Sequence, residues 1–353
     1  MFARCAARVW GSDDVGWRIV RVAFDSRPVS DPHGVGRYAR CLLQALRETA
    51  EPGSEILETH RPRRAEVFHS PWMGGAMLHS PCPMVVTLHD LAALKRPSEL
   101  LRSDARPRLR QLAVQRAVRV IVATESLARD ALEILDLERE QLDVIHEAPA
   151  ACMYPRSVHE VAQVRARFAL PERYLLWVGG LRHPDPGKHL AKLAATPRAL
   201  PLVLVGSTSP WTHQLPGVIL TGYVADEHLA ALYTGAHALV VASDEEGSGL
   251  PAVEALACGT PVVACEVAAL REVLYQRVTF VPNCDLPALL ATAEAAQRPA
   301  PPAPAWTWQD VARATWRVYE HALAQAGERR TVGRRRRAAA ATAVAGAEEA
   351  LTQ

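Results

Sequence analysis

The chain alternates short apolar runs with longer segments in which apolar residues recur every three or four positions. The first run, residues 17–25 (WRIVRVAFD), is rich in β-branched residues, and residues 37–50 then repeat apolar residues with a helical period. Near-continuous apolar runs such as 65–71 and 83–90 are typical of strands in a parallel sheet covered on both faces. The pattern predicts an α/β fold built of strand–helix–strand units.

The remaining predicted elements form two sets that meet between residues 147 and 174. Further strands are expected at residues 119–124, 143–150, 174–180, 200–207, 217–224, 237–243, 261–267 and 278–282. Further helices are expected at residues 109–118, 126–135, 228–236, 250–259, 268–274 and 287–297. Right-handed crossovers between such strands give two doubly wound sheets, one in each half of the chain.

The C-terminal part of the pattern is different. Residues 298–306 (RPAPPAPAW) predict an extended proline-rich connector, and residues 307–326 predict an amphipathic helix with Thr307 as its N-cap. Residues 327–353 are poor in large apolar side chains, and residues 1–16 have scattered arginines without an apolar core. Both terminal segments are therefore expected to be disordered.

Composition narrows the class of protein. The 353 residues carry 40 Lys and Arg against 38 Asp and Glu, and six of the arginines follow residue 326. A body with nearly balanced charge is not expected to bind nucleic acid. The odd number of cysteines, seven, and their wide spacing predict buried thiols in a reducing cytosol rather than disulfides or a zinc site.

A glycine-rich turn between two glutamates is the strongest candidate for a site. The segment SDEEGSGLPAVEALACGTPVVA places Glu246 in a loop after a predicted strand and Glu254 about one turn into the next helix. Gly247 and Gly249 let backbone amides approach a ligand, and the helix N-terminus favours an anion such as a diphosphate. Ligands of open α/β sheets bind beyond the carboxyl ends of the strands. An anionic centre with hydroxyls on both sides describes a nucleotide sugar, although acidic residues and glycines are also common at helix starts for structural reasons alone.

Several motifs, in order along the chain, resemble those of family-4 glycosyltransferases with the GT-B fold, and of bacterial mannosyltransferase-like members in particular. They are HGVGRYARCLLQAL, VVTLHDL, VIVATESLARD, LLWVGG with GKHLAKL, and EGSGLPAVEALACGTPVVA. The resemblance covers roughly residues 17–326. It implies two Rossmann-like domains facing a cleft, residues 17–150 plus 306–326 on the acceptor side and residues 151–300 on the donor side. The C-terminal helix would cross back to the N-terminal domain.

The resemblance also implies a role for individual residues. Glu254 would bind the ribose hydroxyls, Glu246 would face the hydroxyls of the transferred sugar, and Lys188 would neutralise the diphosphate as the leaving group gains charge. His89, at the end of a predicted strand, would bind the sugar or acceptor. The backbone of Gly247, Ser248, Gly249 and Leu250 and the Gly179–Gly180 pair would line the donor, and Gly34, Gly36 and Arg37 would form the acceptor and phosphate loop.

Two positions depart from the family pattern. Gly180 stands where the family usually has an arginine after the phosphate strand, and Ser248 replaces a common aromatic residue. Arg182 can swing into the place left by Gly180. Neither change removes the two glutamates.

The expected activity is a metal-independent, retaining hexosyl transfer, since no DxD-type metal motif lies in a suitable loop. The donor would be GDP-mannose in the first instance and a UDP-sugar in the second, and the acceptor a glycan or a lipid-linked molecule in polysaccharide biosynthesis. No cofactor is expected. The chain would be cytoplasmic, and residues 95–119, with eight basic and two acidic side chains, could bring it to the anionic inner face of the cell membrane.

Two other functions remain open from the sequence. Gly180 and Ser248 allow a catalytically impaired, glycosyltransferase-like binding protein. A dinucleotide-dependent oxidoreductase is a weaker alternative, because HGVGRYA lacks the spacing of a dinucleotide-binding GxGxxG turn.

Overall fold

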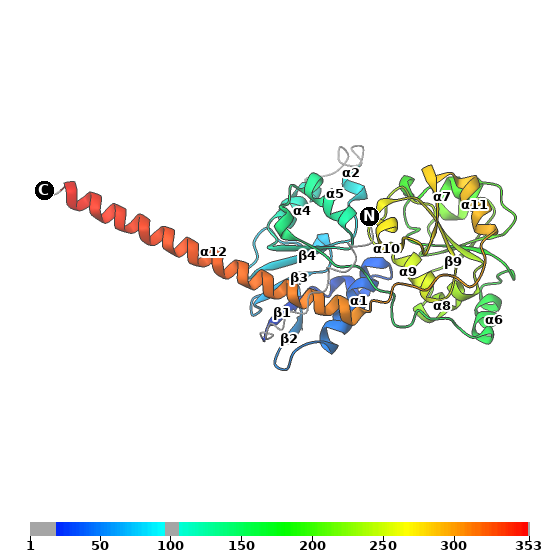
Figure 1. Ribbon diagram of the computed structural model, residues 1–353, viewed down its shortest axis with the longest axis horizontal. Helices are drawn as coiled ribbons and strands as arrows, with labels where there is room; N and C mark the ends of the chain where they lie inside the picture. Colours follow the sequence, from blue (N-terminus) through cyan, green and yellow to red (C-terminus); the bar gives the residue numbers. More distant parts are fainter. Residues whose placement is uncertain (1–18, 96–105, 352–353) are drawn as a thin grey trace.

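The computed structural model of the chain describes residues 19–95 and 106–351, which form two α/β domains and a long C-terminal helix (Figure 1). Each domain contains one sheet of six parallel strands. The doubly wound α/β architecture predicted from the sequence is confirmed.

The sheet of the N-terminal domain has the order β2-β1-β3-β4-β5-β6. Its strands are β1 (Arg21–Phe24), β2 (Glu55–Glu58), β3 (Val67–Ser70), β4 (Met84–Leu88), β5 (Arg119–Val122) and β6 (Leu142–Val144). Its helices are α1 (Gly34–Glu48), α2 (Ala92–Lys95), α4 (Arg106–Gln115) and α5 (Glu125–Leu135). Side chains of α1 pack in one core with strand residues, and those of α4 and α5 pack in another, so helices cover both faces of the sheet.

The C-terminal domain repeats this plan with the order β12-β11-β10-β7-β8-β9. Its strands are β7 (Leu175–Val178), β8 (Leu202–Val205), β9 (Val218–Gly222), β10 (Ala238–Val241), β11 (Val262–Cys265) and β12 (Thr279–Val281). Its helices are α6 (Val158–Arg167), α7 (Leu190–Ala195), α8 (Asp226–Gly235), α9 (Leu250–Ala257), α10 (Ala268–Leu274) and α11 (Leu286–Glu294). Helices α6, α8, α9 and α10 share one core and α7 and α11 the other, because the strands are apolar on both faces.

The last helix, α12 (Trp308–Leu351), returns to the N-terminal domain (Figure 1). Trp308, Trp316 and Tyr319 are buried in the same core as Leu42 and Leu46 of α1. The hydroxyl of Thr307 accepts a hydrogen bond from the Asp310 amide, as the predicted N-cap requires. Helix α12 thus completes the N-terminal domain.

Three expectations are corrected by the structure. Strand β2 and helices α2, α6 and α7 were not predicted, because each is short or partly exposed. Helix α12 continues to Leu351 instead of giving way to disorder after residue 326, because the tail is rich in alanine, arginine and glutamate, which favour helix. Cys265 and Cys284 form a disulfide, since the two strand-end segments that carry them bring their Cα atoms to 4.7 Å.

Other expectations fall on parts of the chain outside this description. Residues 1–16, expected to be disordered, lie outside the described residues, as do residues 96–105 of the basic segment 95–119. Within the described part of the chain, no helix is both long and apolar enough to cross a bilayer.

Candidate functional site between the two domains

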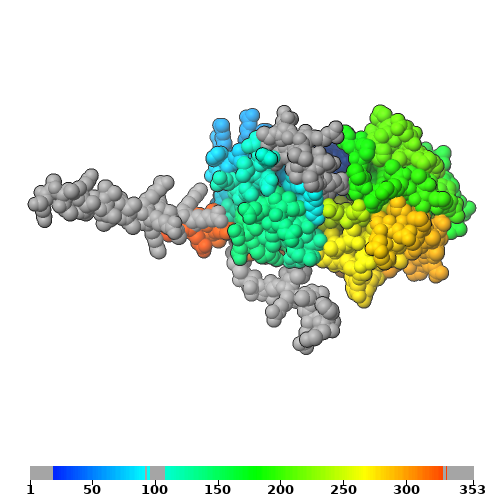
Figure 2. All heavy atoms as spheres, turned by 90° about the horizontal axis from the view of Figure 1, so that it is seen from above, coloured from blue at the N-terminus to red at the C-terminus, as the bar shows by residue number. Residues whose placement is uncertain are grey.

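The two domains are in direct contact along one edge (Figure 2). The Thr124 hydroxyl at the start of α5 donates a hydrogen bond to the Gly247 carbonyl, and Glu272 of α10 accepts from the Glu125 and Ser126 amides. Gly247 itself has no room for a side chain, because a Cβ would lie 1.6 Å from the His89 carbonyl oxygen. These contacts define a closed arrangement of the two domains.

A cavity of about 300 Å³ lies at this junction, beyond the carboxyl ends of strands from both sheets. The N-terminal domain contributes His33, Gly34, Val35, His89, Asp90 and Glu147 to its wall. The C-terminal domain contributes Gly179, Gly180, Lys188 and the segment from Glu245 to Ala252. The position matches the crevice in which doubly wound folds bind ligands.

The loop between β10 and α9 forms the wall of this cavity that suits an anion. Helix α9 begins at Leu250 with Pro251 in its first turn, as the sequence predicted, and Gly249 precedes it with φ +68°. This positive φ favours glycine, and a Cβ at Gly249 would also force the Leu270 side chain to move, because it would approach Cδ2 to 2.2 Å. Pro251 has no amide hydrogen, and the Ala252 and Val253 amides donate to the Gly249 carbonyl. The partial positive charge of this helix start therefore faces the cavity through the amides of Gly249 and Leu250.

Lys188 and Glu246 form an ion pair in the wall of the cavity. Lys188 Nζ lies 3.3 Å from Glu246 Oε1, and the two side chains are 34% and 15% exposed. The charge of Glu246 raises the pKa of Lys188, burial lowers it, and the net effect is a raised pKa. The ammonium group therefore stays charged and is available to an anion that displaces Glu246.

His89 lines the same cavity, but both of its ring nitrogens are already hydrogen-bonded. Nδ1 lies 3.2 Å from Glu147 Oε1 and Nε2 lies 2.8 Å from the Pro71 carbonyl. Burial lowers the pKa of His89, but the hydrogen bond and charge of Glu147 and the Pro71 carbonyl raise it by more. The structure thus favours a charged imidazolium held by Glu147, whereas the sequence suggested a ring that binds sugar or acceptor directly.

Glu254 lies in a second, smaller cavity of about 120 Å³ next to the first. Its carboxylate is 1% exposed and accepts hydrogen bonds from Arg37 Nη1 at 2.5 Å and the Tyr233 hydroxyl at 3.1 Å. Arg37 also donates to Asp226 Oδ1 at 2.6 Å, so one arginine of α1 binds two carboxylates of the C-terminal domain. Burial lowers the pKa of Arg37, but the charges of the two carboxylates raise it by more. Burial raises the pKa of Glu254, and the charge of Arg37 only partly offsets this.

The structure separates the other predicted site residues into two groups. Gly34, Gly179, Gly180 and Leu250 line both cavities, and Ser248 lines the first. Gly36 lines neither and is required for packing, because a Cβ would lie 1.9 Å from the Asp31 carbonyl oxygen. Arg182 is exposed and belongs to neither cavity wall, and a Cβ at Gly180 would meet no atom within 4 Å, so the space left by the missing arginine is open.

Three residues of the site were not singled out from the sequence as site residues. They are Glu147, which holds His89, and Asp226 and Tyr233, which complete the group around Arg37 and Glu254. Asp226 is separated from Arg37 by 189 positions, and no local pattern predicts such a pair. Glu147 lies inside the predicted strand 143–150, whereas the observed strand β6 already ends at Val144, so no signal in the sequence placed this residue in the site.

Comparison with known proteins relates this chain to glycosyltransferases. Residues 172–296, which lie in the C-terminal domain, match the family model described as Glycosyl transferases group 1. The arrangement of the two domains is the GT-B fold, shared with sucrose-phosphate synthase from Thermosynechococcus elongatus (TM-score 0.61, 21% identity, 88% of this chain and 98% of that one). Anabaena HepE in complex with UDP-glucose is also similar (TM-score 0.61, 16% identity, 89% and 100% coverage). At these identities the likeness shows the fold alone.

Curated relatives are similar in sequence over part of their length. The D-inositol 3-phosphate glycosyltransferase of Mycolicibacterium smegmatis is 30% identical over 240 residues, which cover 60% of this chain and 54% of that protein. The Mycobacterium avium protein of the same name is 28% identical over 248 residues, covering 63% and 58%. The chain therefore aligns with only about half the length of the curated relatives it matches.

Proposed function

We propose that the protein is a glycosyltransferase that moves a sugar from a nucleoside diphosphate sugar to a hydroxyl group of a glycan or lipid-linked acceptor, with retention of configuration. The observation that carries this proposal is the cavity between the domains. It brings the ammonium group of Lys188, the glycine turn before α9 and the carboxylate of Glu246 to one place. A diphosphate, and a sugar next to it, match these three groups in charge and hydrogen bonding.

The chemistry follows from the charge that develops when the glycosidic bond breaks. The leaving nucleoside diphosphate gains negative charge, which Lys188 and the amides at the start of α9 stabilise. The N-terminal domain places the hydrogen-bonded pair of His89 and Glu147 on the opposite wall. In this proposal the departing phosphate oxygen accepts the proton of the acceptor hydroxyl, and no metal ion takes part.

The nucleoside would extend from the first cavity into the second, with its ribose at Glu254. Two groups already bind this carboxylate, and a carboxylate has about four acceptor positions, so ribose hydroxyls can join Arg37 and Tyr233. GDP-mannose is the first donor to test, as the sequence motifs suggest. A UDP-sugar is the second, since the similar HepE protein is described in complex with UDP-glucose.

The test is a donor panel followed by two pairs of variants. Release of nucleoside diphosphate is measured with GDP-mannose, UDP-glucose and ADP-glucose, with and without a chelator, and NMR of the product reports the anomeric configuration. Lys188→Met is expected to lower kcat/KM by about 100- to 1,000-fold. Lys192→Met is the matched control, because Lys192 is exposed on α7 and lines neither cavity. Glu246→Gln is paired in the same way with Glu227→Gln on the exposed start of α8.

Each outcome separates the alternatives. Equal losses in Lys188→Met and Lys192→Met would contradict the proposed role of the cavity. Tight donor binding without turnover in the wild type would instead support the impaired binding protein.

We also propose that the acceptor-side domain contacts anionic membranes through α4. Arg108, Arg110, Leu109 and Leu112 are all exposed there, and basic and apolar side chains together suit a lipid interface. Lys95 and Arg119, from the same basic segment, are paired with carboxylates. Co-sedimentation with vesicles containing anionic lipid should fall when Arg108 and Arg110 are both replaced by glutamine, and unchanged binding would exclude α4 as the contact.

A further inference from the structure

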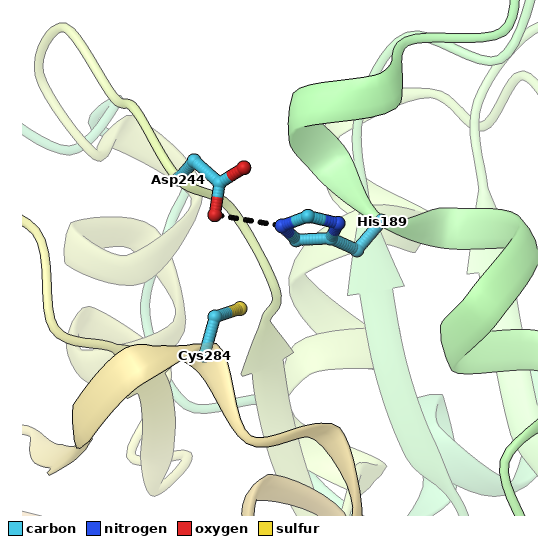
Figure 3. A group of neighbouring side chains, drawn as sticks. All are labelled: His189, Asp244 and Cys284. Carbon is cyan, nitrogen blue, oxygen red and sulfur yellow. Dashed lines mark hydrogen bonds and ion pairs between the residues drawn. The ribbon is translucent and has the colours of Figure 1, made fainter.

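Three side chains with metal-binding atoms converge behind the donor cavity. They are His189 at the start of α7, Asp244 in the loop after β10, and Cys284 in the short 3-10 helix Pro282–Cys284 (Figure 3). His189 Nε2 lies 2.7 Å from Asp244 Oδ1, and one ligand atom from each of the three residues lies within 4.8 Å of the other two. In Figure 3 the Cys284 side chain lies below the hydrogen bond that joins the Asp244 carboxylate to the His189 imidazole.

A fourth ligand is available next to this group. Cys265, buried at the end of β11, forms the disulfide with Cys284, so its sulfur is one bond away from the cluster. Reduction of this bond would leave the Cys284 thiol beside the imidazole and the carboxylate, with the Cys265 thiol as its neighbour. Cysteine, histidine and aspartate are the ligands of four-coordinate zinc sites, in which neighbouring ligand atoms lie about 3–4 Å apart.

The backbone around the cluster fixes three of these ligands. The Asp244 amide donates to the Gly187 carbonyl at 2.8 Å, which ties the β10–α9 loop to the segment that carries His189. His189 and Cys284 both adopt left-handed backbone conformations, with φ of 47° and 46°. Non-glycine residues hold such conformations only where the surrounding structure imposes them, so the two side chains are directed by the fold. Asp244 is 54% exposed and gives an ion a path from solvent.

We propose that, when Cys265 and Cys284 are thiols, these two sulfurs together with His189 and Asp244 bind one divalent cation of the zinc class. A small dithiol reductant supplies two electrons and two protons to the disulfide and is itself oxidised to a disulfide. Binding of the cation then releases the two thiol protons as thiolate–metal bonds form. A small disulfide oxidant would reverse this by forming the protein disulfide, being itself reduced to two thiols and leaving the ion with too few ligands.

The site is separate from the proposed sugar transfer, and it is tested by metal binding alone. Its place in the fold nevertheless links two loops of the donor cavity, since His189 follows Lys188 and Asp244 precedes Glu246 by two residues. A bound ion would hold these loops together more firmly than the hydrogen bond between His189 and Asp244 does.

The experiment uses the full chain, reduced with a phosphine, with the thiol state verified by alkylation and mass spectrometry. Titration with Co²⁺ should give a thiolate-to-cobalt charge-transfer band and the strong visible absorption of a tetrahedral site, and one equivalent of Zn²⁺ should abolish both. Competition with a chromophoric chelator then measures the zinc affinity. Cys265→Ser and Cys284→Ser should each weaken it by at least about 100-fold, while Cys152→Ser, which changes a free cysteine outside the cluster, should not.

Two results would overturn the inference. One is a reduced wild-type protein that shows no charge-transfer band, a measurement that does not depend on the folding of any variant. The other is zinc affinity that is unchanged in both Cys265→Ser and Cys284→Ser, or equal in the reduced and oxidised proteins.

Discussion

Replacing Arg37 with methionine is expected to lower the stability of the protein more than any loss of an exposed charge would. Arg37 lies 2.5 Å from Glu254 and 2.6 Å from Asp226, and its side chain is only 10% exposed. At an effective dielectric constant of about 20, one such contact is worth about 7 kcal/mol before desolvation is subtracted. Breaking a buried pair costs about 3–5 kcal/mol, because the remaining carboxylates stay buried without a counter-ion.

The assay is urea unfolding followed by tryptophan fluorescence, on the wild type, Arg37→Met, Glu254→Gln and the double variant. With a slope of about 2–3 kcal/mol per molar urea, Arg37→Met should lower the midpoint by roughly 1–2 M. The double variant should be less destabilised than the sum of the single variants by about 2 kcal/mol, because the two side chains share one interaction. Arg47→Met on the same helix is the matched control, since its pair with Glu58 is half exposed and should contribute less than about 1 kcal/mol.

The reasoning is refuted if the coupling between Arg37 and Glu254 is below about 0.5 kcal/mol, or if Arg37→Met and Arg47→Met shift the midpoint equally. Either result would mean that the closed arrangement does not depend on this contact. Small-angle scattering of the same variants gives an independent measure, because loss of the contact should let the domains separate.

Three further predictions follow from single contacts. Gly180→Arg should tighten the binding of a nucleoside diphosphate, measured by calorimetry, by about tenfold or more. Gly180 lines both cavities with open space around it, and a hydrogen bond to a charged group contributes about 1.5–3 kcal/mol. Equal or weaker binding would contradict this prediction. Glu147→Gln should lower the pKa of His89, which an NMR titration measures. A raised pKa stabilises the folded protein at pH values below the pKa of the unfolded state, and this stabilisation is lost as the pH rises through the pKa of the folded state, so the variant should lose more stability at low pH than at high pH. A pKa of His89 that remains raised would exclude Glu147 as the cause. Burial, with a smaller contribution from the charge of His89, lowers the pKa of His69 from 6.5 to about 3. The free energy of unfolding should therefore fall by about 1.4 kcal/mol per pH unit as the pH drops from 6.5 towards 3, and His69→Gln should flatten this slope in urea unfolding at several pH values. Parallel curves for the variant and the wild type would show that other groups cause the loss of stability in acid.

The sequence predicted elements best where one local pattern decides the structure. The apolar run 237–243 contains β10, and the proline after Gly249 marks the start of α9, because strand burial and helix initiation are local properties. Strand β2 was missed because a glutamate stands at each end of its sequence EILE, which leaves too few apolar positions to indicate an edge strand. Helix α6 was missed although Ser157 and Glu160 form the capping box that the sequence displays.

The candidate site divides along the same line. The glycine turn and its two glutamates lie within one segment, so their shared place in the fold could be predicted from spacing. Their partners could not, since Arg37 meets Glu254 across 217 positions and across a domain boundary. The disulfide was missed for a similar reason: the spacing of Cys265 and Cys284 says nothing until β11 and the 3-10 helix after β12 are placed side by side.

The contacts of Lys188 and Glu246 suggest how donor binding and sugar recognition are linked in the proposed reaction. Without a ligand the two side chains neutralise each other, so neither charge is free. An arriving diphosphate is the stronger partner for the ammonium group, because it brings more negative charge and is also held by the α9 amides. Its binding would release Glu246 to accept hydrogen bonds from the sugar hydroxyls next to it. A free nucleoside diphosphate should therefore bind without help from Glu246, whereas discrimination between sugars should depend on it, so Glu246→Gln should change the ratio of kcat/KM values between donors more than the affinity for the diphosphate product.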